Sequence, residues 1–295
     1  MIEIIHLKHN EIDKNKWDRV VASSNFALPY FFSWYLDVVS PSWEALVSTD
    51  FQYIMPITTK KKFGVKYVIQ PPFTQQLGIL SNNIPIDQTI VTEFLKKIPY
   101  LIYDINLNYN NVSKESKLNL ILPPQDYCIV SSNYNKNTKR NISKALSSGV
   151  EIKSIKLSEF LSLLNCDECK ISNNKTLLIN LLNELSIKNY LFINGAFKDG
   201  ELIAGLAAII GISKMIYFAP ISNMVGKKYC AMFLLMDNAI KYSMDKGYTF
   251  DFEGSMIPGV KQFYLGFGAQ PQLYYRAHRL RNKKLFDALH RLFRK

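Results

Sequence analysis

The sequence is poor in cysteine and histidine, with four of each among its 295 residues. So few cysteines cannot form the disulfide framework of a small secreted domain in a chain this long. Cys166 and Cys169 form a CxxC pair, but a structural zinc site needs two further ligands, and neither a second CxxC pair nor a suitably spaced pair of histidines is present. We therefore expect no metal site and interpret the CxxC pair as chance spacing.

Long apolar runs and targeting signals are also absent. The longest apolar run, from Leu202 to Ile212, is too short to span a bilayer. The first ten residues lack the charged start and the long apolar core of a signal peptide. The sequence predicts a cytoplasmic protein without a transmembrane segment.

Several motifs that identify enzyme classes are missing. The sequence has no GxxxxGKS or GxxxxGKT loop, no GxGxxG loop, no HExxH zinc motif and no GxSxG nucleophile motif. It has no RNA-binding signature beyond its charge, and nothing in it indicates DNA binding. P-loop, dinucleotide-binding, zinc-peptidase and serine-hydrolase chemistries are therefore not supported.

Acidic residues are outnumbered, because 24 Asp and Glu face 36 Lys and Arg and leave a net charge of +12. Such an excess attracts anions. The basic residues gather at Lys60–Lys62, at Lys136–Arg140 and in the tail after Tyr275. A diffuse excess would serve solubility alone, whereas this clustering favours an anionic partner. Nucleotide-linked sugars, tRNA, coenzyme A and acidic membranes all have the required charge.

What the sequence does contain is an internal repeat. Residues 191–223 read as three strands joined by tight turns, and a helix is predicted from about Tyr229. Residues 43–78 have the same layout. Three pairs of matching residues in the two segments are 148 or 149 positions apart: the turn residues Asp50 and Asp199, and, after the third strand, Pro72 with Pro220 and Gly78 with Gly226. A repeat of this length indicates two copies of one structural unit.

Each copy is predicted to be mixed α/β (α+β), with a mostly antiparallel sheet flanked by helices. We expect the N-terminal domain over residues 1–124 and the C-terminal domain, which carries the candidate site, over residues 125–276. A basic amphipathic helix is predicted over 277–295. We expect this helix to pack on the N-terminal domain; contact with an anionic membrane or with RNA is the alternative.

The strand predicted over residues 248–253 ends in two carboxylates. Side chains on a strand alternate, so Asp251 and Glu253 are expected on one face and the aromatic residues on the other. Two neighbouring carboxylates can act as a general base and its partner, since repulsion raises one pKa toward neutrality. The alternative for both is pairing with lysines or capping of the next turn. We take Asp251 as the expected base.

A helix opened by Asn137 or Thr138 and ended by Gly149 places Lys136, Arg140 and Lys144 on one side. Cations near a helix start do not complement its dipole, which prefers anions there. A bound phosphate or carboxylate would explain them, with Arg140 able to make a bidentate contact. The alternative is a solvated basic face.

The sequence resembles the Fem peptidyltransferases, which are tandem GNAT-fold enzymes. The resemblance rests on the repeat, on FFSWYLDVV in its first copy, and on TKRNISKA, FLLMDNAIKYSMDKG, DFEG and GVKQFYLGFG in its second copy. It implies transfer of an amino acid from aminoacyl-tRNA to an amine of a peptidoglycan precursor. It also implies that Thr138, Arg140 and, more weakly, Lys144 contact the anionic acceptor, and that Tyr217 does so from the second meander.

The sequence departs from this family at Phe263-Tyr264, where members typically have phenylalanine and lysine. The neutral Tyr264 would donate a hydrogen bond near the acyl oxygen, and Lys261 is the candidate to supply the missing charge. Ordinary GNAT enzymes bind the coenzyme A pyrophosphate on a glycine-rich loop. The matching segments MVGKKYCA and QQLGIL hold one glycine each, which favours aminoacyl-tRNA or another donor.

These observations predict a transferase that attaches an acyl or aminoacyl group to an amine of an anionic cell-envelope precursor, in peptidoglycan or surface-polysaccharide assembly. No tightly bound cofactor is expected, and the donor is left open between aminoacyl-tRNA and acyl-CoA. Two alternatives remain. One is a catalytically silent tandem-GNAT binder of a nucleotide-sugar or RNA, and the other is a coenzyme A-dependent N-acetyltransferase acting on an amino sugar.

Overall fold

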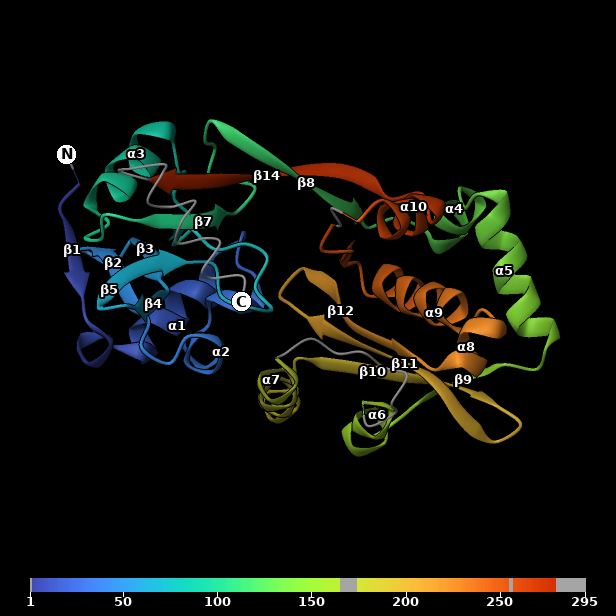
Figure 1. Ribbon diagram of the computed structural model, residues 1–295. Helices are drawn as coiled ribbons and strands as arrows, with labels where there is room; N and C mark the ends of the chain where they lie inside the picture. Colours follow the sequence, from blue (N-terminus) through green and yellow to red (C-terminus); the bar gives the residue numbers. More distant parts are fainter. Residues whose placement is uncertain (1, 165–173, 255–256, 280–295) are drawn as a thin grey trace. The chain divides into compact units, whose positions relative to one another are not determined.

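The computed structural model describes residues 2–164, 174–254 and 257–279 and divides the chain into two compact units (Figure 1). Unit 1 is Met1–Lys117 with Leu273–Lys295, and unit 2 is Leu118–Gln272. The domain limits expected from the sequence are residues 124 and 276. The chain passes between the units slightly earlier, within strands β8 (Glu115–Leu122) and β14 (Gln270–Arg279).

Two sequence predictions fall largely on residues that the structure does not describe. The Cys166–Cys169 pair lies wholly outside the described residues. The terminal helix expected over 277–295 does so from residue 280 onward, so its packing stays a prediction. Its first three positions differ from the prediction, because residues 277–279 end strand β14.

Unit 1 contains two groups of paired strands. The first is the sheet β1 (Ile4–Leu7), β2 (Glu44–Ser48), β3 (Tyr53–Ile57) and β6 (Leu80–Ser81), in that order. The second has the order β4 (Thr59–Lys62), β5 (Val65–Ile69), β7 (Tyr103–Leu107) and β14. Helices α1 (Lys14–Ser23), α2 (Ser33–Val39) and α3 (Gln88–Lys97) accompany them. Asp13 and Asp87 start α1 and α3 by accepting backbone N–H bonds, as N-cap residues do.

The first-copy meander differs from its prediction at the middle strand. The sequence reads as one strand between the Asp50 turn and the Gly64 turn. The structure has two strands there, because β3 ends at Ile57 and β4 begins at Thr59 in the other group. The Thr58 hydroxyl between them donates to the Ile69 carbonyl at 2.7 Å. This bond fixes the start of the β4–β5 hairpin, which is a long-range contact that local sequence does not reveal.

Unit 2 is built around a six-strand array in the order β8, β13, β12, β11, β10, β9. Its strands are β9 (Glu151–Ser154), β10 (Leu191–Lys198), β11 (Glu201–Ile210), β12 (Lys214–Ser222) and β13 (Thr249–Asp251). Its helices are α4 (Tyr127–Ser132), α5 (Lys136–Ser147), α6 (Leu157–Leu163), α7 (Lys175–Ile187), α8 (Met224–Lys228), α9 (Ala231–Asp245) and α10 (Pro258–Gly266). Helix α9 covers one face of β10–β12, and α6 and α7 lie on the other (Figure 1).

The second-copy meander forms as predicted. Asp199 and Gly200 both have positive φ, at +51° and +85°, which makes the tight turn between β10 and β11. Helix α9 begins at Ala231, two residues after the expected start, and its periodic face is buried. Helix α5 begins earlier than expected, at Lys136, because Asn135 is its N-cap and accepts the Thr138 N–H at 2.8 Å. No helix within the described segments has the length and apolar content needed to cross a membrane.

Candidate active site in unit 2

The candidate site lies where two parallel strands of unit 2 diverge. Strand β12 pairs with β13 in parallel only from Lys214 to Ile216, which is opposite Asp251. Strand β13 ends there, whereas β12 continues to Ser222 beside β11. The carboxyl ends of parallel strands that separate in this way leave space for a ligand beside exposed backbone and side chains. Tyr217 is the first β12 residue beyond the pairing.

Three aromatic rings meet at this divergence. The Tyr264 ring of α10 lies 5.7 Å from the Tyr217 ring in an edge-to-face arrangement and 4.9 Å from the Phe252 ring. Both tyrosines are buried, with 6 % and 7 % exposure for Tyr217 and Tyr264. Burial raises the pKa of each phenol above its ordinary value of 10, so both remain protonated hydrogen-bond donors at neutral pH. The structure thus brings together two of the predicted site residues.

Glu253 adds a carboxylate to this cluster. The residue is half-buried, and its Oε1 atom is shielded from solvent. Burial raises the pKa of Glu253 to about 8. Glu253 follows Phe252, whose ring lies 4.9 Å from the Tyr264 ring, and its charge is, after burial, the next cause of the raised pKa of Tyr264. A carboxyl group that titrates near neutral pH can take a proton from a substrate amine.

Asp251 does not face an open cleft, in contrast to the sequence prediction. It is 2 % exposed, and its Oδ2 lies 3.3 Å from the Lys214 ammonium, which is also buried. Its Oδ1 accepts hydrogen bonds from the Asn119 amide and from the Glu253 backbone N–H, both at 2.9 Å. The alternative weighed from sequence, pairing with a lysine and capping of the next turn, describes its contacts. Asp251 therefore positions the turn that carries Glu253.

The basic helix α5 presents its predicted site residues in two environments. Thr138 is buried against α10, where Gly266 leaves room for its hydroxyl; a Cβ on that glycine would come within 2.5 Å of it. Arg140 and Lys144 are exposed, and the Arg140 guanidinium contacts Asn137 at 2.8 Å. The Asn135 N–H donates to the Gly266 carbonyl at 2.9 Å, which joins the start of α5 to the end of α10.

An open depression of about 400 Å³ lies at this junction of helices. Its rim is polar and its wall is partly aromatic; the lining residues are Asn135, Asn137, Thr138, Phe233, Gly259, Gln262, Phe263 and Gly266. Lys261 lies on the same helix as Gln262 and Phe263 and is half-buried. It precedes Tyr264 by three positions, a spacing that makes the two residues neighbours on one side of α10.

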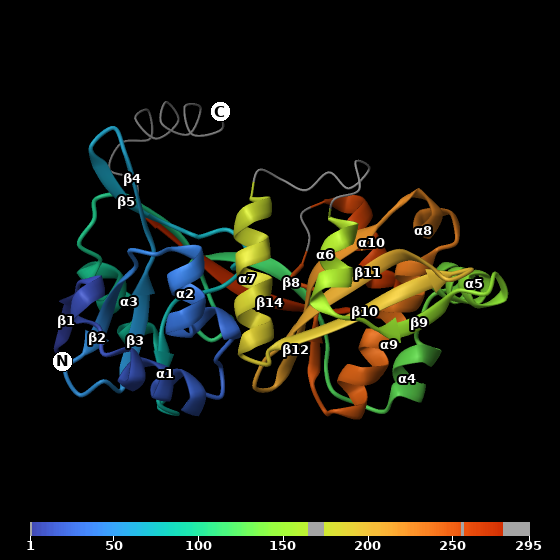
Figure 2. The ribbon, with the colours of Figure 1, turned by 90° about the horizontal axis from the view of Figure 1, so that it is seen from below.

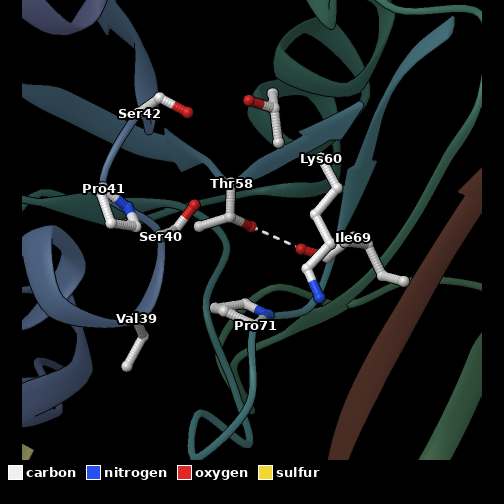
Figure 3. Close-up of a pocket in the computed structure, with 9 residues that line it drawn as sticks. Val39, Ser40, Pro41, Ser42, Thr58, Lys60, Ile69 and Pro71 are labelled. Atoms are coloured by element: carbon white, nitrogen blue, oxygen red, sulfur yellow. Dashed lines mark hydrogen bonds between the residues drawn. The ribbon is translucent and has the colours of Figure 1, made fainter. Parts of the chain in front are cut away.

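Unit 1 has a smaller pocket of about 130 Å³ (Figure 3). Hydroxyl side chains from two segments of the chain face it, namely Ser40 and Ser42 after α2 and Thr58 before β4, with Lys60 alongside (Figure 3). Thr59 also lines it, and its Oγ1 is buried without a hydrogen-bond partner in the described structure. This pocket contains donors for an oxyanion but no carboxylate.

The sequence analysis expected Asp251 and Glu253 on one face of a regular strand, which the structure does not have. Strand β13 ends at Asp251, and Glu253 has a φ of +57°, so the period-two pattern does not extend to it. The signal that was available is the Glu253-Gly254 pair at a strand end. Gly254 also has a positive φ, at +53°, and both residues together turn the chain.

No protein-family model and no curated protein matches the sequence. Solved structures match in fold over nearly the whole chain. FemX aligns with a TM-score of 0.69 at 11% identity, covering 97% of this chain and 99% of FemX. L-PGS from Bacillus licheniformis aligns with a TM-score of 0.56 at 11% identity, covering 92% and 93% of the two chains.

A tandem GNAT protein from the clavulanic acid biosynthesis pathway also aligns, with a TM-score of 0.52 at 8% identity, covering 95% of this chain and all of that one. The chain therefore has the fold of tandem GNAT proteins. The fold class and the resemblance to Fem-type proteins, both expected from sequence, are confirmed at the level of the fold. At these identities the likeness shows the fold and leaves the reaction to be argued from the site.

Proposed function

We propose that the protein is an N-acyltransferase or aminoacyltransferase whose reacting groups meet between β12 and α10 of unit 2. The observation that carries the proposal is the cluster of Tyr217, Tyr264 and Phe252 rings at the end of β13, which Glu253 follows directly in sequence. Burial raises the pKa of Glu253 to about 8. The acceptor is an amine on an anionic cell-envelope precursor of the peptidoglycan or surface-polysaccharide type. The excess of basic residues supports an anionic acceptor, and the Fem-type fold supports an acyl or aminoacyl transfer.

In the proposed reaction, the acceptor amine attacks in its neutral form, and Glu253 accepts the one proton that the nitrogen loses. The amine nitrogen then forms a bond to the acyl carbon of the donor, and the bond from that carbon to the donor oxygen or sulfur breaks. Tyr264 donates a hydrogen bond to the acyl oxygen as negative charge develops there. The proton held by Glu253 passes to the leaving group, so the products are an amide and the protonated donor remnant. Asp251 takes no proton and holds the Glu253 turn.

Packing of the short helix α8 bears on the identity of the donor. A Cβ at Gly226 would lie 2.4 Å from the Ile203 carbonyl oxygen, so close packing on β11 requires this glycine. Packing alone therefore explains why residue 226 is a glycine, and no bound pyrophosphate is needed to explain it. Helix α8 has five residues and a single glycine, unlike a glycine-rich phosphate loop. These features support an aminoacyl donor such as aminoacyl-tRNA over coenzyme A.

The proposal is tested by incubating the protein with charged tRNA or acyl-CoA and a panel of amine acceptors, with mass spectrometry of the products. The panel pairs nucleotide-linked muropeptides with nucleotide-linked amino sugars. We expect an acceptor whose mass increases by one acyl or aminoacyl group, and no such product with Glu253→Gln. Tight, salt-sensitive acceptor binding without product for any donor would instead support the silent binder.

Arg140 is proposed to contact the anionic part of the acceptor. Because Arg140 is exposed, Arg140→Ala is expected to leave the melting temperature unchanged. Loss of a charged hydrogen bond should raise KM for the acceptor by about tenfold or more, with kcat little altered. Lys144→Ala should act in the same direction more weakly. Lys139→Ala, which removes an exposed charge from another side of α5, is the matched control, and an equal effect of all three would contradict a specific contact.

A further inference from the structure

The hairpin β4–β5 of unit 1 has a feature that the fold does not require. It stands out from the rest of the unit (Figure 2), and its two-residue turn is Phe63-Gly64, with φ values of +49° and +79°. Glycine, asparagine and aspartate suit such a turn, whereas a bulky residue at positive φ is sterically unfavourable. Phe63 is nevertheless 72 % exposed at the tip, and Val65 beside it is 50 % exposed. The Lys62 ammonium lies 5.6 Å from the centre of the Phe63 ring, and this local contact leaves most of the ring exposed.

The strands behind the tip carry only positive charge. Lys60, Lys61, Lys62 and Lys66 lie on the hairpin, and the sequence has no Asp or Glu between Asp50 and Asp87. Lys61 and Lys66 are directly opposite each other across the strands, an arrangement that destabilises a hairpin by itself. Lys66 is offset by Glu44, whereas Lys60 and Lys61 have no carboxylate within ion-pair distance in the described parts of the chain.

The Glu44 carboxylate is engaged in contacts within unit 1 and does not neutralise Lys60 or Lys61 of the hairpin. Burial would raise its pKa, but hydrogen bonds from Lys66, Tyr100 and His6 outweigh burial and lower the pKa of Glu44 to about 2. The hairpin therefore combines an apolar tip with a surplus of cations just behind it. This is the chemistry of a surface that enters the headgroup region of an anionic bilayer.

The spacing of Phe63 and Lys60 along the hairpin agrees with docking on an anionic bilayer. An apolar group that docks on a membrane is buried about 5–10 Å into the boundary of headgroups and acyl chains. Lys60 precedes Phe63 by three residues, which is about 10 Å along a strand. With the hairpin inserted tip first, Lys60 would lie at the level of lipid phosphates. Lys60 also lines the hydroxyl-bearing pocket of unit 1 (Figure 3).

We propose that the β4–β5 hairpin is a membrane-docking element that inserts Phe63 and Val65 into bilayers containing anionic phospholipid, with Lys60–Lys62 contacting the phosphates. Nucleic acid would also attract the lysines, and a base could stack on Phe63, but it gives no reason for a second exposed apolar residue at the tip. The inference is independent of the reaction proposed for unit 2, because binding is measured without substrate.

The test is co-sedimentation of the full chain with vesicles of phosphatidylcholine alone or of equal parts phosphatidylcholine and phosphatidylglycerol. We expect binding only to the phosphatidylglycerol vesicles. Lys60→Glu with Lys61→Glu should weaken it by more than about twentyfold, at roughly fivefold for each lost lysine. Phe63→Ser with Val65→Ser should weaken it by about tenfold or more. Phe63→Trp should show a blue-shifted emission on addition of the same vesicles.

Ile187→Ser with Lys188→Glu is the matched control, since it removes an equally exposed apolar residue, 70 % exposed, and a neighbouring lysine from the end of α7. It should bind vesicles as the wild type does, and all variants should melt at the wild-type temperature. The proposal is overturned if the wild type does not bind vesicles or if the hairpin variants bind them normally. It is also overturned if the protein binds RNA but not vesicles, and the variant Phe63→Ser with Val65→Ser binds RNA as tightly as the wild type.

Discussion

Glu253→Gln is expected to lower kcat for acyl transfer by about 10²–10⁴-fold, the usual contribution of a positioned general base. Glutamine has the same shape and cannot accept the proton of the amine. Glu253 is half-buried, and below pH 8 its carboxyl is mostly protonated and uncharged, as a glutamine amide is. The variant should therefore fold normally, with an unchanged circular dichroism spectrum. A matched change, Glu201→Gln on the exposed start of β11, should leave kcat unaltered.

The same substitution should change how stability depends on pH. The pKa of Glu253 is about 8 in the folded protein and 4.5 ordinarily, so the folded state binds more protons between those values. Stability contributed by this group is therefore present at low pH and is lost as pH rises through about 8. The wild type should lose melting temperature relative to Glu253→Gln over this window. If the melting temperatures of the two proteins depend on pH in the same way, the Glu253 carboxyl is not buried as described.

Asp251→Asn is expected to destabilise the protein by about 3–5 kcal/mol, because it leaves the buried Lys214 ammonium without this counter-charge. The quantity to measure is the free energy of unfolding in urea. Adding Lys214→Met removes the buried cation and should recover most of the loss. A double variant no more stable than Asp251→Asn would contradict the importance of this ion pair.

The double variant, Asp251→Asn with Lys214→Met, also tests whether Asp251 or Glu253 is the general base. The asparagine introduced by Asp251→Asn retains an oxygen that can accept the Glu253 N–H, so the double variant with Lys214→Met should keep activity within about tenfold of the wild type. If Asp251 were the base, as the sequence alone suggested, the stable double variant would itself lose about 10²–10⁴-fold in kcat. The comparison therefore distinguishes a positioning residue from a catalytic one.

The fold was predictable where local chemistry determines it. The Asp199-Gly200 turn and the buried face of α9 both depend on neighbours a few positions apart. These features needed no knowledge of contacts between distant segments.

The remaining features depend on long-range contacts. The separation of β3 from β4 depends on the Thr58 bond to Ile69, and the burial of Asp251 depends on Lys214, which is 37 residues away in sequence. Strand alternation cannot show that β13 ends at Asp251 and that Glu253 adopts a positive φ. A carboxylate pKa near 8 is a property of the assembled surroundings and has no local signature.

The most direct test of Glu253 as the general base is the pH dependence of kcat/KM for the wild type and Glu253→Gln, with the donor and acceptor found in the product screen. We predict that the wild-type value rises with pH and that one titration step lies near pH 8, the pKa of Glu253. Glu253→Gln should lack that step and keep only the rise due to the acceptor amine. Identical profiles for the two proteins, or a variant as fast as the wild type, would contradict the assignment of Glu253 as the base.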